Sequence, residues 1–438
     1  MQYLPNLLFA LALFVGVGFF ARNVRKLSRN IKLGKDVDRT DRKSDRWKNM
    51  IMIALGQSKM VKRPLSGFLH IIVYVGFIII NIEVLEIVLD GLLGTHRLFQ
   101  PILGNAFYGF LIGTFEVLAL LVLIVVIIFW LRRNASNIKR FLSTEMKGWP
   151  KKDGNYILYF EVVLMSLFLT MNATDSAFQE AGIGNVISQF LVPIFDGFSP
   201  EKLHLIERSA WWVHILGILI FLNYLYYSKH LHILLAFPNT YFANLNPKGQ
   251  FSNIEAVTKE VKLMMDPDAD PYVMPEEGAE ESELEKFGAS DVTDLNWVQL
   301  LNAYTCTECG RCTSSCPANL TGKKLSPRKI MMDTRDRLEE VGRNIDANNG
   351  QFKDDGKQLL NDYISPEELW ACTSCNACVE ECPVNIDPLS IIMDMRRYLV
   401  MEQSAAPQEL NMMMTNVENN GAMWQYSQQD RLNWAKED

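Results

Sequence analysis

Eight cysteines, the only ones in the 438-residue chain, fall into two copies of one spacing. Each copy reads C-x2-C-x2-C-x3-C-P, and the cysteines are Cys306, Cys309, Cys312 and Cys316, then Cys372, Cys375, Cys378 and Cys382. This run is typical of proteins that bind [4Fe–4S] clusters through four thiolates. Because such clusters exchange single electrons, the spacing predicts a redox relay.

The fourth cysteine of each copy is expected to bind the other cluster, because three closely spaced thiolates leave the last iron out of reach. Structural zinc would leave the repeated register without a role, and disulfides would require an oxidising compartment. We therefore expect cluster one on Cys306, Cys309, Cys312 and Cys382, and cluster two on Cys372, Cys375, Cys378 and Cys316.

Apolar segments dominate the first 235 residues, whereas the remainder is polar and acidic. Five stretches are candidates to cross a hydrocarbon core of about 30 Å, and they run approximately over residues 4–20, 65–89, 106–131, 156–171 and 210–227. The net charge of −7 and its distribution give no indication of nucleic-acid binding. The sequence thus predicts a five-helix transmembrane bundle followed by a separate polar region.

Lysine and arginine are concentrated in two of the connecting segments. Residues 22–63 carry 14 basic residues against four aspartates, and residues 132–152 carry seven more. The loops at 91–105 and 172–209 carry one and two. Because basic loops stay in the cytoplasm, we expect a multi-pass protein of the cytoplasmic (inner) membrane. Its cysteine-rich region would be cytoplasmic, and its basic segments would contact anionic lipid.

Histidine is scarce, with six residues, so the position of each carries information. His70 lies about one turn inside the second apolar segment, and His232 lies near the inner end of the fifth. Two histidines from facing helices at one depth would form an axial pair for haem iron. His214 is expected near the outer end of the fifth segment, on the same face as His232 if that helix is continuous, with His230 pointing nearly the other way.

The role of His214 stays open between three alternatives. It could bind a second haem with an unidentified partner, or help to bind a quinone while Glu83 or Glu86 exchanges protons, or be hydrogen-bonded inside the bundle. A purely structural role also competes for His70 and His232. The remaining histidines, His96 and His204, fall in outer loops as ordinary surface residues.

The membrane region resembles a known family. Five spans, an inward-facing C-terminal end and two histidines 18 residues apart look like the haem b (gamma) subunit of respiratory nitrate reductase and the membrane subunit of heterodisulfide reductase. The nitrate reductase pattern has a second histidine ten residues after the position of His70, where this chain has Ile80. The resemblance implies haem b, with one haem better supported than two, and quinone as an exchangeable redox partner.

The C-terminal region is similar to the helical ferredoxin module of heterodisulfide reductase and anaerobic glycerol-3-phosphate dehydrogenase. The matching motifs begin at Cys306 and Cys372, and helices are expected over 327–341 and 388–403. The cysteine-rich CCG repeats of some relatives are absent, since all eight thiols are already assigned. The resemblance therefore implies a separate CCG-type Fe–S subunit, or a flavoprotein dehydrogenase, as the cytoplasmic partner.

The expected architecture is all-α and has three parts. These are a transmembrane cytochrome b-like domain (1–237), an acidic linker (238–295) and a helical ferredoxin domain (296–438). The expected function is electron transfer between a cytoplasmic partner and quinone, as a subunit without catalytic residues of its own. The alternative is a haem-free membrane anchor that carries an Fe–S scaffold.

Overall fold

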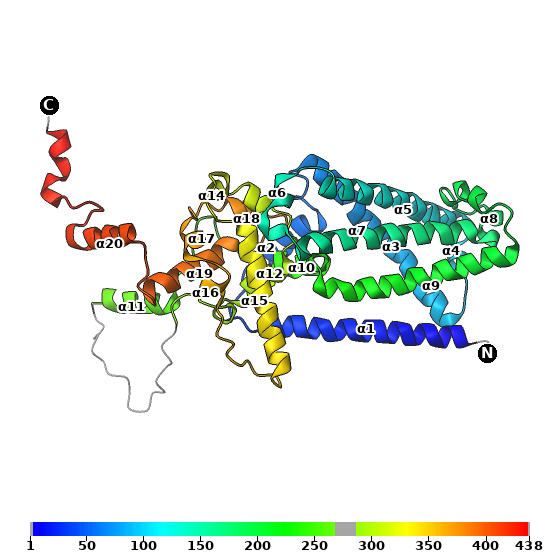
Figure 1. The fold of residues 1–438 in the computed structure, drawn as a ribbon, viewed down its shortest axis with the longest axis horizontal. Helices are drawn as coiled ribbons and strands as arrows, with labels where there is room; N and C mark the ends of the chain where they lie inside the picture. Colours follow the sequence, from blue (N-terminus) through cyan, green and yellow to red (C-terminus); the bar gives the residue numbers. More distant parts are fainter. Residues whose placement is uncertain (1–2, 268–285, 437–438) are drawn as a thin grey trace.

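The structure is a computed structural model, and it describes residues 3–267 and 286–436. Within these ranges the chain forms helices and no strands. The molecule is elongated, with a bundle of long helices at one end and shorter helices at the other (Figure 1). The most acidic stretch of the expected linker, residues 268–285, lies outside the described residues.

Five helices are long and apolar enough to cross a membrane, which confirms the five expected spans. Each is longer than the apolar stretch that predicted it, although α9 ends three residues before its stretch does. The helices are α1 (Leu4–Ile31), α3 (Pro64–Leu93), α5 (Asn105–Asn134), α7 (Trp149–Thr174) and α9 (Pro200–Tyr224).

The ends of these helices follow from local sequence. Proline occupies the first turn of α1, α3, α7 and α9, where its missing N–H is not needed. Helix α3 ends at Gly94, whose φ of 73° is the left-handed conformation that glycine adopts readily. The five helices pack in a closed ring, in which α1 contacts α3 and α9, and α5 and α7 complete the circle.

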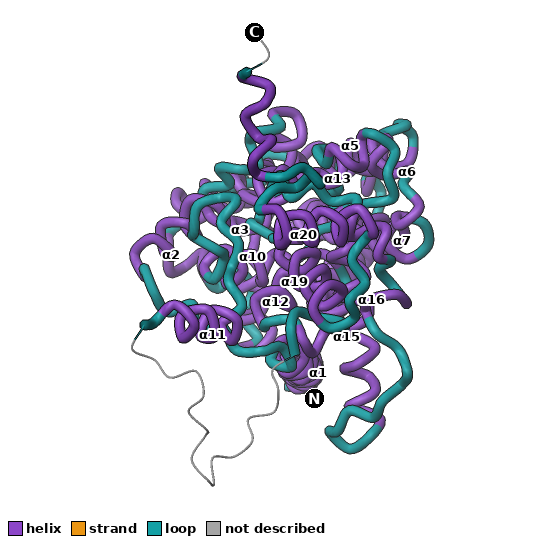
Figure 2. The backbone as a smooth tube through the Cα atoms, turned by 90° about the vertical axis from the view of Figure 1, so that its left-hand side faces the viewer, coloured by secondary structure: helices purple, strands orange, loops and turns teal. Residues whose placement is uncertain are grey.

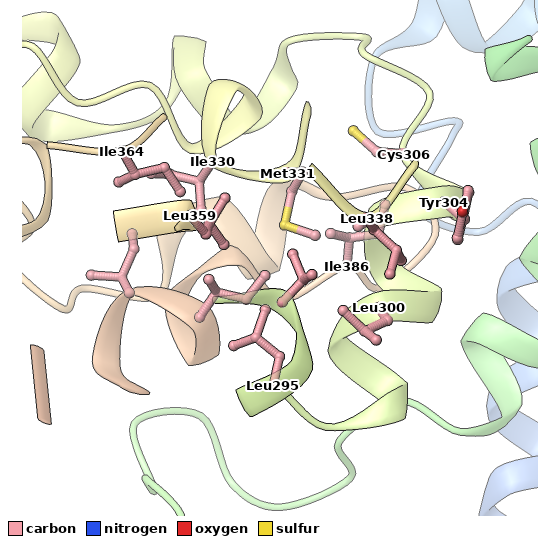
Figure 3. Close-up of a cluster of buried hydrophobic side chains, with 14 of the residues drawn as sticks. Leu295, Leu300, Tyr304, Cys306, Ile330, Met331, Leu338, Leu359, Ile364 and Ile386 are labelled. Atoms are coloured by element: carbon pink, nitrogen blue, oxygen red, sulfur yellow. The ribbon is translucent and has the colours of Figure 1, made fainter. Parts of the chain in front are cut away.

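The cysteine-rich region folds as a set of short helices around one apolar core. Its buried side chains include Leu300, Ile330, Leu338, Leu359 and Ile386 (Figure 3). The two helices expected from sequence are present, and the helices are α12 (Trp297–Thr305), α13 (Arg311–Ser314), α14 (Pro317–Leu320), α15 (Pro327–Ala347), α16 (Leu359–Asp362), α17 (Pro366–Trp370), α18 (Ala377–Glu381) and α19 (Pro388–Met401).

This region lies against one end of the bundle, which we call the inner end; the opposite end is the outer end. The inner end carries α2 (Lys43–Met50), α6 (Lys139–Leu142) and α10 (His232–Tyr241). Viewed from that side, α10, α12 and α19 lie over the end of the bundle (Figure 2). The two basic segments are therefore at the same end of the molecule as the cysteines.

Buried polar contacts hold the two parts together. Arg328 of α15 is fully buried, and its guanidinium pairs with Glu145 at 2.7 Å. Asn30 at the end of α1 donates to the Tyr304 hydroxyl at 2.9 Å. Because an unpaired buried charge is costly, these contacts fix the position of the cysteine-rich region on the bundle.

The expected domain boundaries fall within packed parts of the structure at two places. Position 237 falls inside α10, which packs on α12 of the cysteine-rich region. The end of the expected linker is packed as well, since Val292 is buried and Asp291 pairs with Arg337. Apolar residues of this segment, Val292 among them, are buried in the core, although the acidic composition of the segment suggested exposure to solvent.

A last helix, α20 (Gln408–Asn420), and a 3-10 segment at Gln428–Ala435 extend away from the rest of the molecule (Figure 1).

Candidate functional site

The two cysteine motifs share one backbone design. In the first motif Glu308 and Gly310 have positive φ values of 53° and 71°, and in the second Ser374 and Asn376 have 56° and 58°. A short helix follows each, α13 after Gly310 and α18 after Asn376. Such alternation turns successive backbone N–H groups into a concave nest that suits anionic groups. The Ser374 N–H donates to the Cys372 sulfur at 3.4 Å.

Gly310 is required by its surroundings as well as by its φ value. A Cβ atom at this position would lie 2.5 Å from Nη1 of Arg328. That guanidinium is in place because Nη1 donates to the Arg140 carbonyl at 2.7 Å while Nη2 pairs with Glu145. The first motif therefore packs directly against Arg328, whose ion pair with Glu145 holds the cysteine-rich region on the bundle.

Cys306, Cys309 and Cys312 line one cavity together with Cys382 from the second motif. Cys378 reaches the same cavity, and Met331, Pro383, Ile386 and Pro388 are among its apolar lining residues. Among the described residues, no three His, Cys, Asp or Glu side chains converge as they would around one metal ion. Thiols distributed around a cavity suit an iron–sulfur cluster better than a single zinc ion. Zinc binds its four ligands at about 2.0–2.3 Å, so they would have to converge on one point.

The remaining thiols gather around the second motif. Burial raises the pKa of Cys372, and the neighbouring Cys316 and Cys375 raise it further. The pKa of Cys378 is also raised, by burial first and then by Asp387, Cys372 and Cys316. Cys316, which belongs to the first motif in sequence, thus lies beside the thiols of the second. The structure thus places thiols of the two motifs beside one another, with Cys382 near the first three cysteines and Cys316 near Cys372 and Cys378.

The thiols of the first set oppose one another's ionisation. Burial raises the pKa of Cys382 to about 11, and the nearby Cys309 adds to the effect. The pKa of Cys312 is raised by burial and then by Cys309, Cys306 and Cys382. Four buried thiolates would repel one another, and cationic metal bound between them would offset this repulsion. A thiol that coordinates a metal is deprotonated outright. The residues therefore fit an iron–sulfur cluster.

His70 and His232 face one another at the inner end of the bundle. Their ring centres are 6.5 Å apart and the ring planes meet at 44°. Two imidazoles on opposite sides of one metal, with metal–nitrogen bonds of about 2 Å, place their ring centres roughly 6 Å apart. The observed separation therefore fits a pair of axial ligands on one iron.

The hydrogen bonds of these rings support the same interpretation. Nδ1 of His232 lies 3.0 Å from the Lys229 carbonyl oxygen. Since a carbonyl only accepts, Nδ1 carries the proton, and burial lowers the pKa of His232 so that Nε2 is free to bind metal. Nδ1 of His70 is buried without a hydrogen-bond partner among the described residues. An unpaired buried ring nitrogen is costly, and a metal bound at Nδ1 itself would satisfy it.

A third histidine lies beside this pair. The His230 ring centre is 5.6 Å from that of His232 and 5.4 Å from that of Phe221. The expectation that His230 points the other way is wrong because the fifth helix is not continuous. Helix α9 ends at Tyr224, Ser228 is extended (φ −117°, ψ 146°), and His232 begins a new helix, α10.

His214 is separate from the other two predicted ligands. Its side chain is 2% exposed, and Nδ1 lies 3.0 Å from the Leu164 carbonyl oxygen. Because α9 starts at Pro200, ten residues before the apolar stretch, His214 lies near the middle of that helix rather than near its outer end. Phe168 is the aromatic ring beside it, and no other histidine ring lies against it in the described part of the chain.

The outer end contains a polar network around Arg97. Its Nε donates to Asp175 at 3.0 Å, and Nη1 donates to the Tyr108 hydroxyl at 3.4 Å. Burial would raise the pKa of Asp175, but His96 and Arg97 outweigh burial and lower it. Glu86 accepts from the Tyr108 hydroxyl at 3.1 Å and from a backbone N–H at 2.7 Å. Both oxygens of this carboxylate are therefore engaged.

Glu83, one turn earlier on α3, differs from Glu86. The residue is 4% exposed, and its Oε2 has no hydrogen-bond partner within the described ranges. Of the two carboxylates expected to exchange protons with quinone, only Glu83 keeps a free oxygen. His96 and His204 are at the surface as expected, with half to three quarters of each side chain exposed. The expectation of a loop is wrong for His204, which lies in the first turns of α9 because that helix begins at Pro200.

Fold and site together define a membrane protein with an iron–sulfur region on one side. Residues 305–386 match the family described as 4Fe-4S dicluster domain. Over 98% of its length the chain is 28% identical to the probable iron-sulfur-binding oxidoreductase FadF of Bacillus subtilis. Over 92% it is 25% identical to the EtfAB:quinone oxidoreductase of Syntrophomonas wolfei. No solved structure matches the chain.

Two further relatives are similar to part of the chain. The probable membrane-anchored ferredoxin of Chromohalobacter salexigens is 34% identical over 34% of this chain and 24% of its own length. A component of the CoB-CoM heterodisulfide reductase of Methanosarcina acetivorans is 33% identical over 25% of this chain and 53% of its own. The chain spans 61% of FadF and 55% of the EtfAB:quinone oxidoreductase. It is thus related to iron–sulfur oxidoreductases and contains a 4Fe-4S dicluster domain.

Proposed function

We propose that the chain transfers single electrons between a redox protein that binds its cysteine-rich region and quinone in the membrane. The observation that carries the proposal is the convergence of three groups at the inner end of the bundle. The first set of thiols, the His70–His232 pair and the ends of the membrane helices all meet there. The printed names of its relatives, an EtfAB:quinone oxidoreductase among them, agree with such a relay.

The cysteines would hold two [4Fe–4S] clusters in the crossed arrangement. Cys306, Cys309, Cys312 and Cys382 would hold cluster one, and Cys372, Cys375, Cys378 and Cys316 would hold cluster two. Each cluster would supply one-electron exchange at a potential set by its surroundings. Backbone N–H groups near the sulfurs, such as that of Ile386 on Cys382 at 3.2 Å, would stabilise the thiolates.

The two proposed cluster sites differ in their exposure and in their contacts with the membrane helices. Arg311, between two ligands of cluster one, donates to the carbonyls of Lys59 and Met60 just before α3, the helix of His70. Cys375 of the second set is exposed. The second set would therefore meet the partner protein, and the first would face the histidine pair.

His70 and His232 would hold haem b, which supplies one-electron exchange when bound. The Lys229 carbonyl fixes the tautomer and orientation of His232, as second-shell acceptors do at metal sites. The nitrate reductase-like membrane region inferred from sequence leads to the same cofactor. His214 keeps Nε2 free for a second haem or a quinone oxygen, because its Nδ1 bonds the Leu164 carbonyl.

Quinone chemistry moves protons as well as electrons, and Glu83 is the carboxylate that we assign to proton exchange. Its unpaired Oε2 can accept or donate a proton without breaking a hydrogen bond, whereas Glu86 would have to give up two. We expect Glu83→Gln to reduce quinone turnover while the haem and cluster spectra stay unchanged, and Glu86→Gln to lower protein yield. Unchanged turnover in Glu83→Gln would contradict this assignment.

We infer the location of the chain from its basic segments. Since lysine and arginine lie at the inner end, that end would face the cytoplasm, with the chain spanning the inner membrane. The partner would be a cytoplasmic flavoprotein dehydrogenase or a CCG-type Fe–S subunit, and electrons could flow in either direction.

An optical spectrum of the purified full-length chain tests the haem directly. The dithionite-reduced protein should show the α-band of b-type haem, and His70→Ala should remove it without loss of iron–sulfur absorption. His204→Ala is the matched control, because this histidine is 76% exposed and remote from the inner end. A wild-type spectrum with iron–sulfur absorption alone would contradict the proposal and favour a haem-free anchor.

A further inference from the structure

Lys229 contacts both proposed redox sites at once. Its backbone carbonyl accepts from Nδ1 of His232 at 3.0 Å. Its ammonium forms an ion pair with Glu308, the residue between Cys306 and Cys309. The side chains of Lys229 and Glu308 are 9% and 2% exposed. One residue thus joins the histidine turn of the membrane region to the first cysteine loop.

The contact continues into the cysteine loop itself. The backbone N–H of Glu308 bonds the Cys306 sulfur, while one carboxylate oxygen also accepts from Arg335 at 2.8 Å. A connected path therefore runs from a cluster-one thiol, through Glu308 and Lys229, to the ring of His232.

Lys229 is itself held firmly on the bundle side. Its backbone N–H donates to Asp153 at 3.1 Å, and its ammonium donates to the Pro150 carbonyl at 2.7 Å. The Tyr224 hydroxyl donates to the other oxygen of Asp153 at 2.6 Å. The ion pair with Glu308 is thus made by a residue whose backbone and side chain are both fixed.

A general need for stability does not explain this arrangement. Burying an ion pair brings little net stabilisation compared with apolar residues. Glu308 also has a φ of 53°, which is unfavourable for a residue other than glycine. The equivalent position of the second motif, Ser374, carries no charge. Of the two motif loops, only the one that contacts the histidine turn has a buried carboxylate at this position.

We infer that Lys229 is a positioning residue that fixes His232 and the cluster-one loop relative to one another. Its carbonyl sets the orientation of the iron-binding ring, and its ammonium, through Glu308, sets the distance of the Cys306 loop from that ring. This inference rests on the proposed function, because both contacts matter only if the two sites exchange electrons.

The test uses the full-length chain and two variants, each of which changes one partner of the ion pair between Lys229 and Glu308. Lys229→Met removes the ammonium, and Glu308→Gln keeps the shape of the side chain but weakens the ion pair. Lys229→Arg is the conservative replacement. Lys62→Met is the matched control, because Lys62 pairs with Glu380 across the same two parts of the chain but is 54% exposed and contacts no proposed ligand.

The readouts are the low-temperature EPR spectrum of the oxidised haem, the EPR spectrum of reduced cluster one and the rate of haem reduction. We expect Glu308→Gln to shift the haem signal although it does not touch the haem, and Lys229→Met to shift the cluster signal as well. Both should slow haem reduction about tenfold or more, the effect usual for second-shell residues. Lys229→Arg and Lys62→Met should resemble wild type.

The inference is overturned if Glu308→Gln, with full haem and iron content, gives the wild-type haem signal and rate. The same result in Lys229→Met would agree with a role limited to folding. If Lys229→Met fails to assemble, the isosteric Glu308→Gln still decides. A wild-type protein without a haem signal would instead contradict the proposed function, and the inference would fall with it.

Discussion

The crossed assignment of the fourth cysteines can be tested by comparing variants in pairs. Cys309 belongs to cluster one and Cys375 to cluster two under either assignment, because each is the middle one of the first three cysteines of its motif. Their alanine variants therefore define what loss of each cluster looks like. In the structure Cys382 lines the cavity of Cys309, and Cys316 lies beside Cys372. Cys382→Ala should therefore resemble Cys309→Ala, and Cys316→Ala should resemble Cys375→Ala.

The expected magnitude follows from the ligand sets. Two [4Fe–4S] clusters correspond to about eight irons per chain, and each variant should lose about four of them. Cys382→Ala should also slow haem reduction, because it removes cluster one, which would face the histidine pair. Cys316→Ala should leave the step from cluster one to haem intact. Iron and sulfide analysis, EPR of the reduced protein and stopped-flow absorption measure these quantities.

The reverse pairing would refute this reasoning. If Cys316→Ala matched Cys309→Ala in its EPR spectrum and haem kinetics, each motif would hold its own cluster. The closeness of Cys382 to Cys309 would then have no role in ligation.

Further predictions concern how the cysteine-rich region is held on the bundle. Arg328→Met should leave the largely buried Glu145 carboxylate without its cationic partner and destabilise the protein by about 3–5 kcal/mol. Lys324→Met, at an ion pair more than 60% exposed, should cost about 0–1 kcal/mol; thermal unfolding followed by cluster absorption distinguishes them. Gly310→Ala should abolish assembly of cluster one, and Gly322→Ala, with a similar φ of 83° and open space around it, should retain the iron. Burial would raise the pKa of Glu145, but Arg328 and Ser326 outweigh burial and lower this pKa below 4.5. The ionised Glu145 therefore contributes its full stabilisation above pH 4.5, and this contribution is lost as the pH falls through the lowered pKa. The difference in unfolding temperature between wild type and Glu145→Gln should accordingly be constant from pH 8 to about 5.5 and shrink at lower pH; a constant difference at every pH would contradict the ion pair.

Much of the fold could be predicted from local sequence. Apolar length alone predicted the five membrane helices, and the repeated cysteine spacing predicted that thiols of the two motifs lie close together, as Cys382 and Cys309 do. The pairing of His70 with His232 also follows from their depth. These features depend on hydrophobicity and on short-range spacing, which a sequence displays directly.

The features that sequence reasoning missed depend on tertiary contacts. The break at Ser228 interrupts an apolar pattern that looks continuous, and it brings His230 to the histidine pair. The ion pair between Lys229 and Glu308 joins residues 79 positions apart, and no periodicity indicates it. The run from Ser228 to His232 contains three ionisable side chains at the end of an apolar segment, and this was the one available signal.

The reoxidation of the reduced full-length chain by a short-chain quinone tests the central claim most directly. We predict that His70→Ala, which should lack the haem band, recovers its iron–sulfur absorption much more slowly than wild type after quinone is added, because the histidine pair lies with the first set of thiols at the inner end of the bundle. If His70→Ala recovers at the wild-type rate, or if wild type has no haem band at the start, the relay through the histidine pair is wrong.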